Sequence, residues 1–313
     1  MLLTIVIPFF NSGNHLRRCV ESIVNQFIND EVEIVLVDDG STDKSFQTAK
    51  ILSDDYKFVR LLQNDRNRGL SFSRSAGAQI GSGEFVWHCD SDDIILEGVI
   101  EKLLIKLENT CADILVYNYV KSSHPNSNNL SHSLVEVANK NSLDFANSFT
   151  GPIWNKVFRS EIVKHLSCGK MYINNGEDMV FCLEALAKAG TIEFINYPIY
   201  NYIKYTDTMT DSIEKNIDSY LKSQDNIASI LVSMDTLDLS SFHRRYFVEY
   251  FLTYNLNHLI RMTHMDLFRV IQRVLIFLVL LKKYLNVTSI FRIARLCCLG
   301  IIYRIYKKLC VEY

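Results

Sequence analysis

The stretch that decides the fold is Val32-Glu33-Ile34-Val35-Leu36-Val37-Asp38-Asp39-Gly40-Ser41, an apolar run rich in β-branched residues that ends in turn formers. Such a run predicts a buried strand, and a similar run at 3–8 opens the chain. Between them, apolar residues recur every three or four positions over 16–27, which predicts a helix capped at Asn11 or Ser12. Strand, helix and strand at this spacing form a βαβ unit. We therefore expect a parallel sheet whose ligands gather at the carboxyl ends of its strands.

Acidic clusters follow two of these apolar runs, and a third precedes a helical pattern. The cluster at 90–93 reads Asp-Ser-Asp-Asp and comes directly after the apolar run 85–89. Carboxylates one residue apart can face one hard cation such as Mg²⁺ or Mn²⁺, which shares its other positions with phosphate oxygens. Glu177-Asp178 precedes the helical pattern 179–186. The plainer alternatives are an ordinary acidic turn at 90–93 and, at 177–178, carboxylates that favour the positive end of a helix.

Four motifs in order strengthen the interpretation as a nucleotide-diphosphate site. They are Ile-Val-Ile-Pro at 5–8, Val-Asp-Asp-Gly-Ser-Thr-Asp at 37–43, Asn-Arg-Gly-Leu-Ser-Phe-Ser-Arg-Ser-Ala-Gly at 67–77 and the cluster at 90–93. With Glu177-Asp178 they resemble the ordered signature of the family 2 glycosyltransferases. The resemblance implies an α/β fold of the GT-A type, a Rossmann-like and mainly parallel sheet flanked by helices. It also implies inverting transfer of a sugar from a nucleotide-diphosphate donor, a UDP-sugar.

The resemblance also assigns roles to single residues. Asp39 would accept a hydrogen bond from the pyrimidine N–H of the nucleotide, and Asp92 would bind a Mn²⁺ or Mg²⁺ ion. Asp178 would be the base that removes the proton from the acceptor hydroxyl. Asp90 would contact ribose or the metal shell, and Arg74 would reach the base or the diphosphate. The residues implied on the nucleotide-sugar side are Pro8, Asp38, Asp39, Arg74, Asp90 and Glu177.

Some of these positions have plainer interpretations. The segment 38–43 could be only an Asx-type turn that caps the following helix, and Arg74 could lie on a solvated helix face. The family usually has Asn where this chain has Ser75, which puts the local hydrogen bonds in doubt. The tripeptide at 154–156, Trp-Asn-Lys, resembles a family feature near the acceptor. It could equally be a core anchor followed by a surface charge.

The 313-residue chain has a net charge of -2, but the charge is unevenly distributed. Residues 261–313 contain ten Lys or Arg and two acids, so the first 260 residues carry about -10. The apolar run 274–281 is too short to span a bilayer as a helix. On a helical wheel 290–309 separates apolar from basic residues, as a helix lying in a membrane interface does. The alternative is a helical subdomain that packs on the enzyme or on a second copy.

We therefore expect two parts: a nucleotide-sugar-binding and catalytic domain at 1–210, and a helical, basic extension at 211–313. Eight cysteines without C-x-x-C spacing and the lack of a secretory signal favour a cytoplasmic protein on the inner face of the cell membrane. The expected partners are the donor, a glycan or lipid-linked acceptor of bacterial surface polysaccharide synthesis, and the membrane surface. We expect no nucleic-acid partner, and a homo-oligomer is compatible with the sequence.

Two other classes of protein share parts of this sequence pattern. A nicotinamide-dependent oxidoreductase should carry a glycine fingerprint after its first strand, where this chain has Phe-Phe-Asn-Ser-Gly at 9–13. A better rival is a non-catalytic nucleotide-sugar binder or assembly partner of a glycan-synthesis complex, because binding would need Asp39 and Asp92 but not Asp178.

Overall fold

The structure is a computed structural model of the whole chain, and it describes residues 1–26, 30–122, 131–133, 152–166, 169 and 176–205. These residues belong to one compact unit formed by 1–138 and 147–212. A second unit, 139–146 and 213–313, lies outside the described residues. The prediction of a helical, basic extension at 211–313 therefore concerns residues that the structure does not describe.

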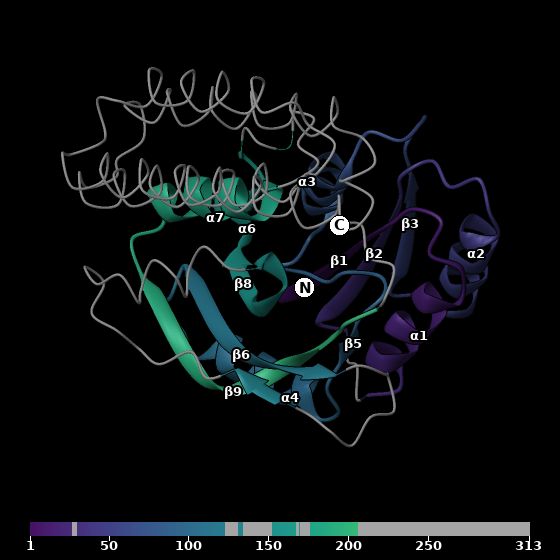
Figure 1. Ribbon diagram of the computed structural model, residues 1–313. Coiled ribbons are helices and arrows are strands. Elements are labelled where there is room, and N and C mark those ends of the chain that lie inside the picture. Colours follow the sequence, from purple (N-terminus) through teal and green to yellow (C-terminus); the bar gives the residue numbers. More distant parts are fainter. Residues whose placement is uncertain (27–29, 123–130, 134–151, 167–168, 170–175, 206–313) are drawn as a thin grey trace, which may run out of the picture. The chain divides into compact units, whose positions relative to one another are not determined.

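The first half of the unit alternates strands and helices, as the sequence predicts (Figure 1). Strand β1 lies between β2 and β4 and is parallel to both, with Ile5 opposite Ile34 on one side and Trp87 on the other. Strand β3 continues the parallel sheet beyond β2. The elements of this half are β1 (Leu3–Phe9), α1 (Gly13–Val24), β2 (Val32–Asp38), α2 (Ser45–Asp55), β3 (Val59–Gln63), α3 (Leu70–Ile80) and β4 (Phe85–His88).

The cap predicted for the first helix is not formed as expected. Ser12 is the N-cap residue of α1, but its side chain makes no capping hydrogen bond. Asn11 has a left-handed backbone (φ 50°), and its Oδ1 accepts a hydrogen bond from the backbone N–H of Thr42, 2.8 Å away. Its amide therefore joins the loops after β1 and β2 instead of capping α1.

The second half extends the same sheet with mixed pairing. Strand β8 is antiparallel to both β4 and β6, whereas β6 and β9 are parallel. Across the described residues the sheet has nine strands in the order β3-β2-β1-β4-β8-β6-β9-β5, with β7 paired to β6. The elements are β5 (Ile94–Ile95), α4 (Val99–Glu108), β6 (Ile114–Ser122), β7 (Ser131–Ser133), η1 (Ile153–Asn155), β8 (Lys156–Arg159), α6 (Ser160–Val163), α7 (Glu177–Lys188) and β9 (Ile192–Ile203).

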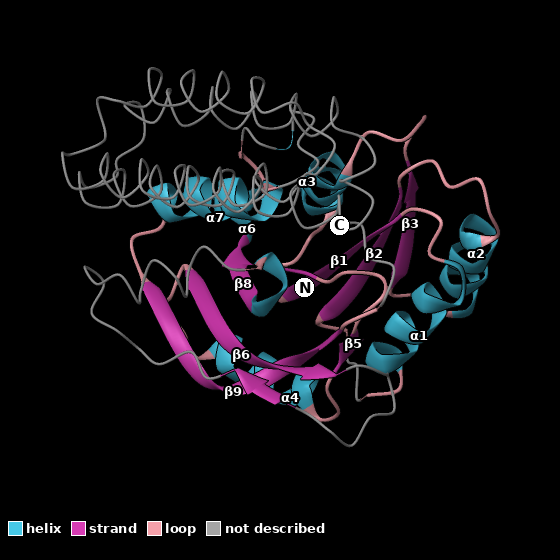
Figure 2. Cartoon of the chain, viewed as in Figure 1, coloured by secondary structure: helices cyan, strands magenta, loops and turns pink. Residues whose placement is uncertain are grey.

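Helices cover both faces of the sheet (Figure 2). Successive side chains of a strand point to opposite faces, so Leu3, Ile5 and Ile7 join a core shared with buried residues of α1, α2 and α4. Val6 points the other way, and α3 packs there so closely that its Gly77 lies against Val6. Both faces are therefore buried around β1, whose seven residues are all buried.

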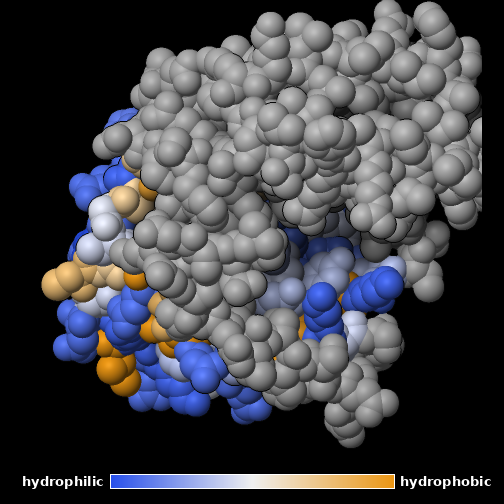
Figure 3. Space-filling view, turned by 60° about the vertical axis from the view of Figure 1, so that its left-hand side comes forward, coloured by the Kyte–Doolittle hydropathy of each residue, from blue (hydrophilic) through white to orange (hydrophobic). Residues whose placement is uncertain are grey.

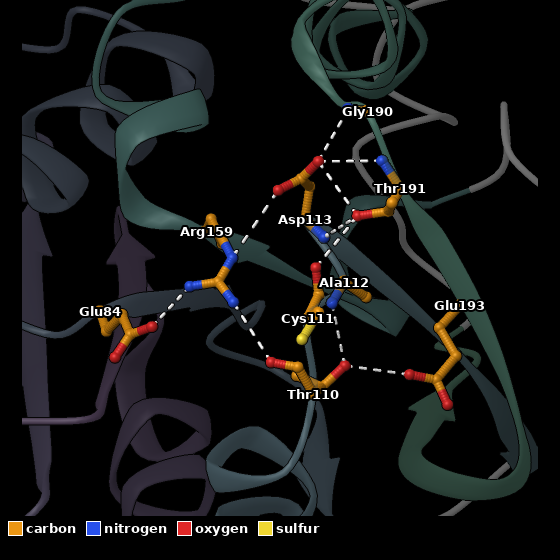
Figure 4. Close-up of polar contacts among 9 residues, drawn as sticks. All are labelled: Glu84, Thr110, Cys111, Ala112, Asp113, Arg159, Gly190, Thr191 and Glu193. Carbon is orange, nitrogen blue, oxygen red and sulfur yellow. Dashed lines mark hydrogen bonds and ion pairs between the residues drawn. The ribbon is translucent and has the colours of Figure 1, made fainter.

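A polar network closes the edge of the sheet where β4, β6 and β9 begin (Figure 4). Asp113 accepts hydrogen bonds from the backbone N–H groups of Gly190 (2.7 Å) and Thr191 (2.9 Å). Arg159 pairs with Glu84 at 2.5 Å and lies 3.7 Å from Asp113. Because β4 begins here, the network lies at the opposite end of that strand from the acidic cluster at 90–93. It links the later strands of the sheet to the parallel half. It does so at the end of the sheet away from the carboxyl ends of the parallel strands, where a ligand site is expected.

The described surface mixes hydrophilic residues with smaller hydrophobic patches on the face shown in Figure 3, as expected for a folded globular unit. Within the described residues no helix is both long and apolar enough to cross a bilayer. The cysteines at 19, 89, 111 and 182 carry free thiols, and three of them are buried.

Candidate active site

The first acidic pair lies where β2 ends. The buried carboxylate of Asp39 accepts hydrogen bonds from Asn64 Nδ2 and from the backbone N–H groups of Arg68 and Gly69, each at 2.8 Å. A carboxylate offers about four acceptor directions, so one remains for a ligand. Gly40 follows with φ +77°, and a Cβ there would lie 2.8 Å from the backbone of Arg66. A glycine is thus needed for the 64–69 loop to approach Asp39.

The other members of this region have structural partners. Asp38 accepts hydrogen bonds from the Ser41 N–H at 3.0 Å and from Gln63 Nε2 at 3.1 Å. The segment 38–43 is therefore turned by its own carboxylates, Asp38 and Asp43, which accept from the backbone N–H groups of Ser41 and Ser45, but the N-cap residue of α2, Lys44, makes no side-chain capping hydrogen bond. Pro8 is buried in β1 opposite Val37 and lies beyond the pairing with β4, so its missing N–H costs no ladder hydrogen bond on that side.

The acidic turn after β4 carries one exposed, one half-buried and one buried carboxyl group, those of Asp92, Asp90 and Asp93. Asp92 is exposed, whereas Asp93 is buried and its Oδ1 accepts a 2.7 Å hydrogen bond from the backbone N–H of Ile203. Asp93 therefore does not cap helix α4, whose N-cap is Gly98. Burial, together with the carboxylates of Asp92 and Asp90, raises the pKa of Asp93 to about 9.

Groups far away in the sequence hold the backbone of this turn. Arg18, on α1, donates a 3.0 Å hydrogen bond to the carbonyl oxygen of Asp92, and the hydroxyl of Tyr205 donates to the same oxygen, also at 3.0 Å. The backbone N–H of Asp90 donates to the hydroxyl of Tyr200 at 2.9 Å. No sequence pattern points to these residues, because they lie 74 to 113 positions away and belong to no motif.

The turn fits a hard divalent cation. Asp92 presents an exposed carboxylate, and Asp90 has one carboxylate oxygen that is not engaged by Arg74. Burial raises the pKa of Asp90 to about 6, and the charges of Asp178 and Asp92 act in the same direction, although Arg74 opposes them. The described residues contain no group of three or more His, Cys, Asp or Glu that could hold a metal. Mg²⁺ commonly needs only one or two carboxylates when substrate phosphates complete its shell.

The second and third acidic clusters meet at Arg74. This side chain is 2% exposed, and it donates from Nη2 to Asp90 at 2.8 Å and from Nη1 to Asp178. Burial lowers the pKa of Arg74, but the carboxylates of Asp178 and Asp90 outweigh this effect and raise it. The interpretation of Arg74 as a solvated helix position was wrong. The structure instead brings the end of β4 and the start of α7 to one guanidinium group.

Glu177 and Asp178 form the first turn of α7, so their charges also face the positive end of that helix. Asp178 Oδ2 accepts a 3.2 Å hydrogen bond from the backbone N–H of Ile153, and its side chain is 27% exposed. Oε2 of Glu177 is buried and has no hydrogen-bond partner among the described residues. Burial and the charge of Asp178 raise the pKa of Glu177 to about 7, against the influence of Arg74.

The tripeptide at 154–156 is buried. Trp154 stacks on Tyr200 with ring centroids 4.4 Å apart and is 5% exposed. Lys156 is fully buried, and its Nζ donates to the carbonyl oxygen of Pro152 at 2.7 Å and to Asn155 Oδ1 at 2.9 Å. Trp154 is thus a core anchor, as one interpretation held, but the expectation of a surface charge at Lys156 was wrong.

Fold and site together define a class: α/β proteins with acidic side chains at the carboxyl edge of a Rossmann-like sheet, arranged as in the GT-A glycosyltransferases. Residues 4–167 match the family described as glycosyl transferase family 2, and the chain belongs to that family.

Among its relatives is the cholesterol galactosyltransferase of Borreliella burgdorferi, 27% identical over 67% of this chain and 62% of that protein. The glycosyltransferase GlyG of Streptococcus pneumoniae is 29% identical over 64% of this chain and 70% of that protein. The chain thus spans less than two thirds of the first of these relatives. The solved structure of Staphylococcus aureus TarS 1–349 in complex with UDP-GlcNAc has the same fold, with a TM-score of 0.65 and 20% identity over 82% of this chain and 73% of that one.

Proposed function

We propose that this protein is an inverting glycosyltransferase that moves a sugar from a UDP-sugar to a hydroxyl group of a glycan or lipid-linked acceptor. The observation that carries the proposal is the shared contact of Arg74 with Asp90 and Asp178. Through this contact Asp178 lies close to the turn at 90–93, which supports a base beside a metal-bound diphosphate. Membership of glycosyl transferase family 2 supports the reaction class. The complex of TarS with UDP-GlcNAc, a protein of the same fold, supports a UDP-sugar as donor.

On the donor side, Asp39 would accept a hydrogen bond from the uracil N–H with its remaining acceptor direction, and Asp38 and Pro8 would shape the same pocket. Asp92, together with Asp90, would hold Mn²⁺ or Mg²⁺. A divalent cation bound there supplies Lewis-acid neutralisation of the charge that grows on the departing diphosphate. The raised pKa of Asp90, caused by burial, agrees with a turn that gains from added positive charge.

On the acceptor side, Asp178 would take the proton from the attacking hydroxyl. The hydroxyl oxygen forms a bond to the anomeric carbon while the bond from that carbon to the diphosphate oxygen breaks, and UDP leaves. Attack from the face opposite the leaving group inverts the anomeric configuration. One base suffices, and no covalent glycosyl-enzyme is required.

The acceptor side of the proposal extends to location. Bacterial surface polysaccharide synthesis on lipid-linked acceptors would place the enzyme on the inner face of the cell membrane, and the basic residues of 261–313 would supply attraction to anionic lipid. The alternative, a non-catalytic nucleotide-sugar binder, is less favoured. The proposed base, Asp178, is held by two hydrogen bonds, from Arg74 and from the backbone N–H of Ile153, close to the turn at 90–93.

The test separates binding from chemistry. We expect UDP to raise the melting temperature of the full chain in the presence of Mn²⁺, because a ligand that binds only the folded state stabilises it. Asp92→Asn should remove this shift. Asp178→Asn should keep the shift but lose hydrolysis of the matching UDP-sugar by about a hundredfold or more.

Unchanged hydrolysis in Asp178→Asn would exclude Asp178 as the base. UDP stabilisation without turnover of any UDP-sugar would favour the non-catalytic binder. No stabilisation by any nucleoside diphosphate, with or without metal, would contradict the donor assignment. Asp54→Asn, at an exposed position of α2, is the matched control and should leave both readouts unchanged.

A further inference from the structure

The guanidinium group of Arg74 is occupied by protein carboxylates. Its two terminal nitrogens donate to Asp90 and Asp178, and only 2% of the side chain is exposed. Its Nε is buried and has no hydrogen-bond partner within the part of the chain that the structure describes. The family resemblance implied that this arginine reaches the nucleotide base or the diphosphate. In the structure it is buried, and each of its terminal nitrogens donates to one of the two carboxylates.

The surroundings of Arg74 keep it in place. Gly77 allows its helix α3 to pack closely against the sheet. On the same helix, Ser73 Oγ accepts a 2.9 Å hydrogen bond from Asn64 Nδ2. His88 is fully buried nearby and packs edge to face against Phe181 of α7, with ring centroids 5.2 Å apart. Burial lowers the pKa of His88 well below its usual value, and Arg74 acts in the same direction. A neutral His88 leaves Arg74 as the cation that both carboxylates contact.

Asp178 is held at both oxygens from two directions. Arg74 binds Oδ1, and the N–H of Ile153 binds Oδ2 at 3.2 Å. The other charged or titratable groups that face it are Asp90 after β4, Glu177 and Cys182 on α7, and Lys156 on β8. Asp90 and Glu177 repel its negative charge. Lys156 donates to Pro152 and Asn155, whereas Arg74 donates directly to Asp178.

We propose that Arg74 is a positioning residue for the base: it orients Asp178, and it does not bind the donor. This inference rests on the function proposed above. It assigns Arg74 to the acceptor half of the reaction, through Asp178, while its second contact fixes the distance between the base and the turn that carries Asp90. Without the guanidinium group, Asp90 and Asp178 would lose the cation that contacts both of them, and the orientation of Asp178 would depend on the backbone N–H of Ile153.

The experiment compares donor affinity with turnover in the full chain. For Arg74→Gln we expect the affinity for UDP with Mn²⁺, measured by calorimetry, to change less than about threefold. The kcat for UDP-sugar hydrolysis should fall by about tenfold to a hundredfold. Arg74→Lys keeps one positive charge and should recover part of the lost kcat, but not the orientation supplied by two separate hydrogen-bond donors.

A double-mutant cycle tests whether Arg74 acts through Asp178. Adding Arg74→Gln to Asp178→Asn should cause less than about a twofold further loss of kcat, because the group on which Arg74 acts is already gone. A tenfold or larger loss of UDP affinity in Arg74→Gln with unchanged kcat would overturn the proposal and assign Arg74 to donor binding. Fully additive losses in the cycle would overturn it as well. If Arg74→Gln does not fold, Arg74→Lys carries both readouts. Absence of UDP binding and hydrolysis in the unmodified chain would instead contradict the proposed function.

Discussion

Glu177 lies at the start of a helix, but the surroundings of its carboxyl group disfavour the ionised form. Its Oε2 is buried without a hydrogen-bond partner among the described residues, and its neighbour Asp178 is negatively charged. These conditions penalise the ionised form, and burial with the charge of Asp178 raises its pKa from 4.5 to about 7. Glu177 should therefore hold a proton in the folded state at pH values where the unfolded chain has released it.

This difference predicts a pH dependence of stability. A raised carboxyl pKa contributes stability that is complete below about pH 4.5 and is lost as the pH rises through 7. At about 1.4 kcal/mol per pKa unit, the contribution of Glu177 should fall by roughly 3 kcal/mol across that window. Glu177→Gln stays neutral, so its free energy of unfolding relative to the unmodified chain should improve with pH by about that amount. Urea unfolding between pH 4 and 8 measures it.

The matched control is Glu101→Gln, which replaces an exposed carboxyl group in the first turn of α4. It should leave the pH dependence of unfolding as it is in the unmodified chain. A pH dependence in Glu177→Gln that follows the unmodified chain throughout would show that Glu177 is ionised in the folded state.

At the level of single residues, the sequence pointed to the acidic clusters but not to their partners. Asp90 and Asp92 could be singled out because they follow an apolar strand pattern, and Asp178 because it precedes an apolar helical pattern. The contact between Asp178 and Arg74, 104 positions earlier, depends on how α7 packs against the sheet. Spacing within a motif carries no information about such a contact, so the sequence assigned Arg74 to a donor or to solvent.

The contact between Arg74 and Asp90 depends on how closely helix α3 packs against the sheet. Gly77 faces β1 and β2, and a Cβ atom there would lie 2.4 Å from Val6 Cγ1 and 2.9 Å from Val37 Cγ2. Both valines are fully buried and, being branched at Cβ, have few alternative rotamers. The close approach of α3 sets the depth at which Arg74, three residues earlier, meets Asp90.

Gly77→Ala should therefore destabilise the protein although alanine favours helix by about 1 kcal/mol over glycine. We expect a net loss of about 1–3 kcal/mol from overpacking. Hydrolysis of the UDP-sugar should also fall, because α3 and Arg74 must move outward. Gln79→Ala, at an exposed position of the same helix, should change stability by less than about 0.5 kcal/mol. Equal or higher stability in Gly77→Ala, measured by urea unfolding, would show that the valines move aside at little cost.

At the level of elements, the early part of the fold was predictable and the later part was not. The runs at 3–8 and 32–41 became β1 and β2, with α1 between them, because local periodicity alone specifies a βαβ unit. Strand β8 inserts between β4 and β6 and is antiparallel to both. That order depends on long-range pairing, which no local pattern in 152–166 reveals.

For the whole molecule, the uneven charge leads to a prediction about membranes. The basic residues of 261–313 should bind anionic lipid with about 1 kcal/mol for each Lys or Arg near the surface. The full chain should therefore sediment with phosphatidylglycerol vesicles more than with phosphatidylcholine vesicles, and less at high salt. Replacing Lys282, Lys283, Arg292 and Arg295 together by Gln should weaken this binding at least about tenfold.

The control replaces exposed lysines of the described unit, Lys44, Lys57 and Lys102, by Gln. It should leave vesicle binding within about twofold of the unmodified chain. Equal losses in both sets of variants would indicate a non-specific charge effect. Absence of binding to anionic vesicles at low salt would contradict the membrane part of the proposal.

The hydrogen bonds that hold the acidic turn at 90–93 have a consequence for synthesis on the ribosome. The turn is made early, but the hydrogen bonds that Ile203 and Tyr205 supply to Asp93 and Asp92 come more than a hundred residues later. A nascent chain that has produced all the donor-side motifs therefore still lacks the groups that brace them. Competence to hold a nucleotide should arise late in translation, when β9 joins the sheet, so a truncated product ending before that strand would not sequester the donor.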